Sequence, residues 1–381
     1  MPMIVTLYDL ISCLLVIVLG LIFCINLNRY FSISQSRIFL LYLWHTFFSF
    51  VYFYYALNVG ADATGYYDRA GVELRSFEFG TIAVDWLVAF FRIFDLSLLG
   101  TFLCFNILGT IGLIAFYASL NKAAKYGSVT IRRFILFLVL LPSISFWSSA
   151  IGKDAISFMA INLMLWAMLN FQRHKKLILL SIGLMLFVRP HMAGIMLLAL
   201  AGSLFFQRNV NVLLRAFMIL IAISASVILV PFALKYAGLG GDVDISKVQN
   251  FIENRQGHNQ DGGGGIDIGS MSLPAKLFTY LFRPMPIEVS SIPQLAASID
   301  NIILLFFTLF GIFSLVRGRD VYAGENHLFM WFYVMSTWII LAVTTANLGI
   351  AVRQKWMFLT VLIYLFVSAL AAKKSNRYKQ Y

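Results

Sequence analysis

Two aspartates between apolar runs are the first residues whose type and position could do chemistry. Asp62 and Asp68 lie in the segment NVGADATGYYDRAGVELRSFEFG, just beyond an apolar run. A carboxylate there could take a proton from an acceptor hydroxyl, which typically accelerates a reaction ~10²- to 10⁴-fold. If the segment is helical, Asp62, Tyr66 and Arg69 share one face and Asp68 points elsewhere. The same spacing also fits a solvated loop with a helix-capping aspartate.

Cations near the ends of other apolar runs form a second candidate set. Charges close to short spans are costly unless they pair or contact an anion, and guanidinium groups match phosphate oxygens. We therefore expect a phosphate to be bound by five residues: Lys153 in SSAIGKDA, Arg189 in VRPHM, Arg283 in YLFRPMP, and Arg353 with Lys355 in ANLGIAVRQKW. For Lys153, an ion pair with the neighbouring Asp154 is the alternative.

Two side chains near these cations are alternative bases. His191 lies next to the Arg189–Pro190 dipeptide, and Glu288 follows Arg283 closely. His191 could act as a base or donate to a phosphate, although a lone histidine is more often structural. The three cysteines are odd in number and lie in apolar runs, and no His/Cys metal spacing, Walker loop or dinucleotide fingerprint occurs. We expect neither a dedicated metal site nor a nucleotide cofactor.

The elements that must position these residues are membrane helices. With 60% hydrophobic residues, 12% charged residues and a mean hydropathy of +0.84, the 381-residue chain is not a water-soluble globule. A span takes about 20 residues. The apolar runs predict a polytopic all-α bundle, one transmembrane domain over 1–381, with eleven spans at 4–25, 38–57, 97–120, 134–150, 154–171, 177–188, 192–206, 216–234, 301–316, 327–346 and 356–372.

Basic residues in the short connections predict the orientation. Most of the 29 Lys and Arg residues fall on one side of the span map, which the positive-inside rule makes cytoplasmic. The N-terminus is then periplasmic and the C-terminus cytoplasmic. The net charge of +12 is explained by this topology, so no nucleic-acid partner is needed.

Two long segments, 58–96 and 235–300, lie on the opposite, periplasmic face, and loops held by a rigid scaffold commonly carry function. In the first, 81–95 predicts an amphipathic interfacial helix whose polar face carries Asp85, Arg92 and Asp95.

The second segment holds the run Gly262 to Gly265, which predicts a mobile flap. It is followed by a second interfacial helix within 272–286, with Pro274 at its start, Pro284 and Pro286 as stops, and its end at Arg283. This helix would place Lys276, Tyr280 and Arg283 on one face.

These residues suggest a family. A span, an outer loop with D-x-x-x-Y (Asp62 to Tyr66), an interfacial helix and a further bundle of spans resemble the GT-C superfamily of membrane glycosyltransferases, although an extra span precedes the loop. The segments FWSSAIGKDA, VRPHMAG, TYLFRPMPIE and NLGIAVRQKW look like those of polymerase-like proteins encoded with bacterial surface-polysaccharide genes. The GT-C resemblance implies that Asp62 is the catalytic base, with Asp68 second. Resemblance to O-antigen polymerases and ligases shifts the emphasis to Arg189, His191, Arg283 and Arg353.

Both resemblances imply one activity in the bacterial inner membrane. A sugar or oligosaccharide would pass from a polyprenyl-(pyro)phosphate carrier to an acceptor hydroxyl at the periplasmic face, during O-antigen, capsule or exopolysaccharide synthesis. The phosphate is already a leaving group, so no cofactor is required, while a divalent cation stays open. Expected partners are the lipid-linked glycan, membrane lipid and other polysaccharide assembly proteins. The alternatives are a transporter or flippase of lipid-linked saccharides and a structural subunit of an export complex.

Overall fold

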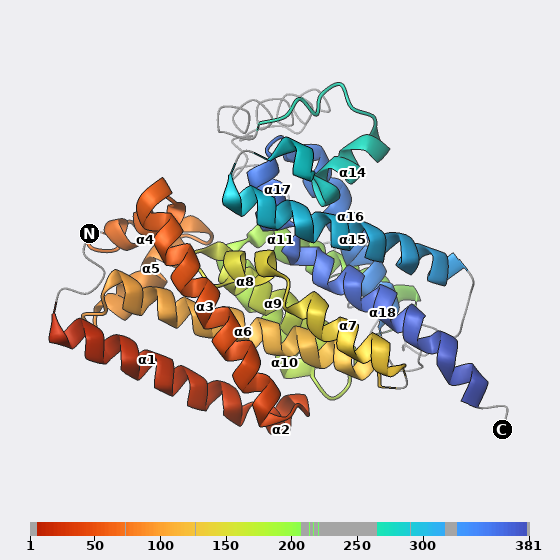
Figure 1. Ribbon diagram of the computed structural model, residues 1–381, viewed down its shortest axis with the longest axis horizontal. Helices are drawn as coiled ribbons and strands as arrows, with labels where there is room; N and C mark the ends of the chain where they lie inside the picture. The colour runs from red at the N-terminus through yellow and green to blue at the C-terminus, as the bar shows by residue number, and fades with distance from the viewer. Residues whose placement is uncertain are drawn as a thin grey trace. The chain divides into compact units, whose positions relative to one another are not determined.

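The structure is a computed structural model that divides into two compact units. It describes residues 6–72, 74–125, 127–206, 265–289, 291–316 and 326–378, with the single positions 213, 216 and 220. The first unit is Met1–Arg189 with Lys374–Tyr381, and the second is Pro190–Lys373. Within the described ranges the regular secondary structure is helical, and one isolated β-bridge joins Gly265 and Asn347 (Figure 1). The predicted all-α architecture is confirmed.

The first unit is built around one central helix. Its helices are α1 (Leu7–Asn26), α2 (Asn28–Phe31), α3 (Gln35–Val59), α4 (Asp62–Arg69), α5 (Thr81–Arg92), α6 (Leu98–Ala123), α7 (Val129–Val139), α8 (Pro142–Ser148), α9 (Lys153–Met168) and α10 (Lys175–Val188). The central helix, α6, packs against α1, α3 and α9, and α9 packs in turn against α10. Glycine allows α6 and α9 to approach closely, because a methyl group at Gly112 would lie 2.9 Å from Met159 Cα.

The second unit contains α11 (Pro190–Phe206), α14 (Leu273–Phe282), the 3₁₀ helix η1 (Pro286–Glu288), α15 (Ile292–Val316), α16 (His327–Thr344), α17 (Leu348–Gln354) and α18 (Trp356–Tyr378), the last belonging to this unit as far as Lys373. Helix α16 packs against α11 and α14. The segment after the glycine run is fixed here too, because Ile266 N donates to Ala346 O at 2.9 Å. Gly262 to Gly264 lie outside the described residues, so the predicted flap stays a prediction.

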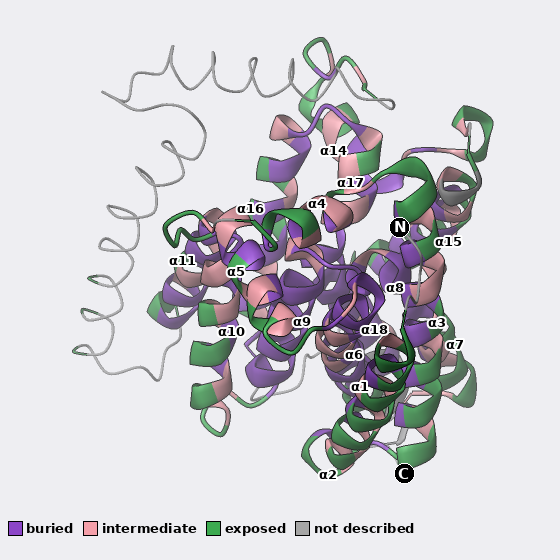
Figure 2. Cartoon of the chain, turned by 90° about the vertical axis from the view of Figure 1, so that its left-hand side faces the viewer, coloured by how far each residue is buried: buried purple, intermediate pink, exposed green. Residues whose placement is uncertain are grey.

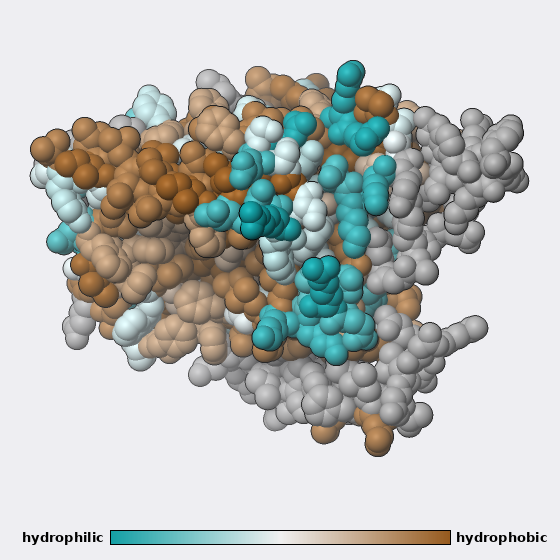
Figure 3. Space-filling model, turned by 90° about the horizontal axis from the view of Figure 1, so that it is seen from below, coloured by the Kyte–Doolittle hydropathy of each residue, from teal (hydrophilic) through white to brown (hydrophobic). Residues whose placement is uncertain are grey.

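Among the described residues, six helices are long and apolar enough to cross a membrane: Leu7–Phe31, Gln35–Val59, Leu98–Ala123, Val129–Ser148, Gln294–Val316 and His327–Thr344. A seventh results if α17 and α18, bent by 54°, form one broken span. The chain is thus a multi-pass membrane protein by helix length and composition. Many large apolar side chains of the described residues are accordingly exposed. Figure 2 shows which parts of the chain are exposed, and Figure 3 shows apolar residues in brown on one face.

The predicted count of eleven spans is larger than the six or seven candidate spans among the described residues. The expected spans at 154–171, 177–188 and 192–206 correspond to α9, α10 and α11, which have 16, 14 and 17 residues. Helix α9 is short yet buried at every position from Ala155 to Met168, so surrounding protein covers it. The expected span at 216–234 falls almost wholly outside the described residues.

Both predicted amphipathic helices form; α5 ends before the predicted boundary at 95, and α14 ends next to Arg283, the arginine at which its end was predicted. Helix α5 ends at Arg92, and Asp85 is buried instead of facing water with Asp95. Helix α14 ends at Phe282 because Pro284 forces the preceding residue out of the helical region, and Arg283 has φ −100° and ψ 154°. The predicted stripe of Lys276, Tyr280 and Arg283 on one helical face is therefore wrong.

Candidate functional site

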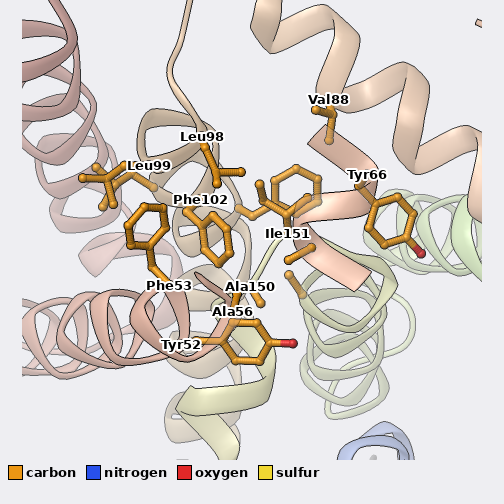
Figure 4. Packing of buried hydrophobic residues seen from close by; sticks show 14 of the residues in the cluster. Tyr52, Phe53, Ala56, Tyr66, Val88, Leu98, Leu99, Phe102, Ala150 and Ile151 are labelled. Atoms are coloured by element: carbon orange, nitrogen blue, oxygen red, sulfur yellow. The ribbon is translucent and has the colours of Figure 1, made fainter. Parts of the chain in front are cut away.

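The short helix α4 carries the predicted base and is held by an apolar face. Ala63, Tyr66 and Ala70 are spaced by three and four residues and are buried in a hydrophobic cluster with Ala150 and Ile151 (Figure 4). The opposite side of the helix stays exposed. Asp62, in the first turn, and Asp68 are both exposed, and Asp68 points away from the Asp62–Tyr66–Arg69 face as the spacing predicted.

Two arginines lock α4 against the segment that follows it. Arg69 donates from Nε and Nη2 to the Asp85 carboxylate at 3.2 and 3.0 Å, and its guanidinium lies 4.9 Å from the Tyr66 ring centroid. Arg92 donates from Nη1 to Tyr67 O at 2.7 Å. Because both arginines are engaged within the chain, α4 is a fixed platform for Asp62.

The start of α9 lies directly against this platform. Gly152, its N-cap, has φ +153°, and a Cβ there would meet Tyr66 Cε2 at 3.7 Å. The next residue, Lys153, is half-buried. A glycine N-cap offers no side chain to the first backbone N–H groups of α9, so the helix dipole adds partial positive charge beside the Lys153 ammonium.

Arg189 ends α10 and closes the same region. It is 6% exposed and donates from Nη2 to Asp154 Oδ1 at 2.5 Å. Nearby, Gly80 N donates to Phe187 O at 2.9 Å, which ties the start of α5 to the end of α10. The sequence predicted that Arg189 binds phosphate, whereas the structure gives it Asp154 as a partner. We call Asp62, Tyr66, Lys153, Asp154 and Arg189 the α4–α9 site.

The α4–α9 site combines the exposed Asp62 carboxylate with the half-buried Lys153 ammonium and the Arg189–Asp154 ion pair. Asp62 comes from α4, Lys153 from the N-terminus of α9, and Arg189 from the end of α10. An acid able to accept a proton and a positive site able to receive a phosphate are the two groups that glycosyl transfer from a phosphate carrier requires.

The other predicted residues belong to the second unit. Arg283 is ion-paired with Glu288 and donates from Nε to Glu288 Oε1 at 2.8 Å. Hydrogen bonding from Arg283 lowers the pKa of the Glu288 carboxyl below its ordinary value, which makes it a weaker base. His191, in the first turn of α11, and Arg353, on α17, are half-buried.

Lys355 has the least exposed position of the predicted cations. It is fully buried, and its Nζ donates to Asn301 Oδ1 and, at 3.5 Å, to Leu281 O. Asn301 Nδ2 donates in turn to Pro284 O at 3.0 Å. This network joins the break between α17 and α18 to the RPMP segment, so the Lys355 ammonium is satisfied by the chain itself.

The sequence analysis missed a buried polar network in the first unit. His45 Nδ1 lies 2.6 Å from Asn106 Oδ1, and His45 Nε2 lies 2.9 Å from Ser148 Oγ. Asn106 Nδ2 donates to Thr46 Oγ1 at 2.8 Å. The sequence could have predicted this network, because polar residues recur four positions apart within two apolar runs, at His45 and Ser49 and at Asn106 and Thr110. Such hydrogen bonds hold membrane helices together, here α3, α6 and α8.

Comparison with known proteins adds no assignment. No model of a protein family matches the chain, no curated protein matches it, and no solved structure matches its fold. Within the described part of the chain, no group of three or more His, Cys, Asp or Glu side chains could hold a metal ion.

Proposed function

We propose that the chain is a membrane glycosyltransferase or polysaccharide polymerase that uses a polyprenyl-(pyro)phosphate-linked donor at the α4–α9 site. The observation that carries the proposal is the proximity of Tyr66 to Gly152, where a Cβ atom would lie 3.7 Å from Tyr66 Cε2, so that the helix of Asp62 lies near the start of α9. A carboxylate and a phosphate-attracting region thus lie at one end of a bundle of apolar helices, where a lipid-linked substrate would arrive.

In the proposed reaction, Asp62 accepts the proton of the acceptor hydroxyl as its oxygen attacks the anomeric carbon. The bond from that carbon to the carrier phosphate oxygen breaks, and the phosphate leaves with the bonding electrons. Lys153 and the N-terminus of α9 stabilise the developing negative charge. Arg189 acts indirectly, since its ion pair with Asp154 fixes the first turn of α9.

The test compares two matched variants in a strain that lacks the chromosomal gene. Asp62→Asn removes the proposed base, and Asp68→Asn makes the same chemical change on another face of α4. We expect Asp68→Asn to restore long-chain surface polysaccharide as the wild type does, and Asp62→Asn to leave it absent at equal protein level in the membrane. Loss of a positioned base should lower the rate ~10²- to 10⁴-fold. Normal polysaccharide with Asp62→Asn would refute the assignment.

Glycan analysis of the same strain distinguishes the kinds of transferase. Accumulated single repeat units indicate a polymerase, a truncated repeat indicates transfer of a single sugar, and an intact polymer on the wrong lipid indicates a ligase. The assignment to surface-polysaccharide synthesis in the bacterial inner membrane would be refuted by an unchanged glycan profile.

One observation favours a second candidate, a transporter of lipid-linked saccharides. Lys355 is fully buried at a 54° break between two helices, and Asp300 is buried in α15. Ionisable groups and broken helices within the membrane are typical of transport pathways. Purified protein in vesicles loaded with a lipid-linked oligosaccharide separates the candidates. The transferase forms a new glycosidic bond, whereas the transporter moves the unchanged oligosaccharide across the bilayer.

A further inference from the structure

A cavity of about 970 Å³ lies at the other end of the first unit. Helices α6, α9 and α10 each have one end near the α4–α9 site, at Leu98, Lys153 and Val188. Their opposite ends, with α2, supply the walls of the cavity. This is the end that the basic connections predict to be cytoplasmic. The volume is within the range of pockets that hold small organic ligands.

The cavity walls are strongly cationic. Of the described residues that line it, six are Lys or Arg and none is Asp or Glu. The six come from three separate connections: Arg29; Lys122 and Lys125; and Arg173, Lys175 and Lys176. Like charges repel when they are gathered at one place, so a cavity of this kind is stabilised by an anion. Orientation of the protein in the membrane needs basic residues near this face, but it does not need them around one cavity.

Aromatic rings form part of the same walls. The His174 ring lies 6.0 Å from Tyr30 and 6.1 Å from Trp166 between centroids, and Lys122 Nζ lies 5.9 Å from the Trp166 ring. Burial, with the charges of Arg173 and Lys122, lowers the pKa of the His174 imidazole. Arg173 and Lys122 therefore both act on the His174 ring at a partly desolvated position, and an anion is held more strongly in such surroundings than in water.

Exposed apolar side chains lie within two helical turns of cavity-lining residues along the chain. Ile22 and Phe23, both 52% exposed, lie on α1 within two turns of Arg29, and Leu179 and Leu180 follow the basic residues at the start of α10. A soluble phosphate would use only the charges. A phospholipid would use the charges for its headgroup and the flanking apolar side chains for its acyl chains.

We propose that this cavity binds the phosphate headgroup of an anionic phospholipid. Basic pockets between membrane helices suit such headgroups, and Tyr30 and Trp166, which line the cavity, are of the aromatic types enriched where membrane proteins meet lipid headgroups. The site is separate from the α4–α9 site and does not depend on the proposed transferase activity.

The test measures lipid binding to the purified full-length protein by native mass spectrometry. Dioleoyl phosphatidylglycerol is titrated against dioleoyl phosphatidylcholine, and inorganic pyrophosphate is used as a soluble probe. The cavity variant Arg29→Gln/Arg173→Gln is compared with Arg132→Gln/Arg133→Gln, which removes the same charge from exposed residues of α7 that do not line the cavity.

We expect phosphatidylglycerol to bind at least about tenfold more tightly than phosphatidylcholine, and the cavity variant to reduce that affinity about 10- to 30-fold, since two charges are lost. The α7 variant should keep the wild-type affinity. Equal affinity for the two lipids, or equal losses in the two variants, would overturn the proposal.

A third variant separates the lipid from a soluble phosphate. Phe23→Ala shortens the apolar flank without changing any charge, so it should weaken phosphatidylglycerol binding and leave pyrophosphate binding unchanged. If Phe23→Ala has no effect and pyrophosphate displaces the lipid completely at millimolar concentration, the ligand is a soluble phosphate and the lipid assignment is wrong.

Discussion

The ion pair between Arg189 and Asp154 should stabilise the first unit strongly. The size of the effect follows from the burial of the two side chains. The two side chains are 7% and 18% exposed and are joined by a 2.5 Å hydrogen bond. Removing one partner of a buried pair leaves an uncompensated charge, at a cost of about 3–5 kcal/mol. The partial exposure of Asp154 lowers that cost, so we expect Asp154→Asn to lower the free energy of unfolding by about 2–4 kcal/mol.

The two single variants should differ because the charges they leave behind differ. Asp154→Asn leaves the buried guanidinium without a counter-charge. Arg189→Met leaves a carboxylate in the first turn of α9, where the helix dipole stabilises it by about 0.3–1 kcal/mol. Arg189→Met should therefore cost less, and the double variant should cost less than the sum of the singles by about 1–3 kcal/mol.

Thermal unfolding in detergent, followed by the fraction of protein that remains monodisperse after heating, measures these differences. In a domain of about 150–250 residues, each kcal/mol of lost unfolding free energy lowers the apparent Tm by about 2–4 °C. A loss of about 3 kcal/mol in Asp154→Asn therefore corresponds to a Tm about 6–12 °C lower. Lys153→Gln, at the neighbouring position, serves as the control and should change Tm little. The reasoning is refuted if Asp154→Asn is no less stable than the control, or if the two single effects add fully.

Two further predictions concern the backbone before α9 and the pair in the second unit. Gly152→Ala forces an alanine to φ +153° against Tyr66 and should lower the free energy of unfolding by about 1–3 kcal/mol. Gly183→Ala has no atom within 4 Å, so it should be neutral or stabilise α10 by up to about 1 kcal/mol. Equal Tm values for the two variants would contradict this prediction. Arg283 lowers the pKa of Glu288, so above pH 4.5 their ion pair should add about 1 kcal/mol or less to the free energy of unfolding. This contribution should disappear as the pH falls through the folded-state pKa. Glu288→Gln should abolish that part of the pH dependence of Tm.

Within the candidate site, the sequence predicted which residues lie near one another along a helix. The spacing of Asp62, Tyr66 and Arg69 gave their common face, and α4 is helical over that range. In the second unit, the sequence also predicted that Glu288 lies near Arg283, because the two are only five residues apart. The end of α14 was also predicted from the sequence, because Pro284 stops a helix at the arginine before it.

Composition and hydropathy alone determined that the chain is an all-helical membrane protein, because the cost of placing polar groups in lipid acts on each run of residues separately. The partner of each cation was decided by tertiary structure. Arg189 meets Asp154 across 35 positions, and Arg69 meets Asp85 across 16. The cationic cavity likewise draws on three connections far apart in the chain. Pairing energy depends on distance and burial in space, and a linear pattern of charges contains neither.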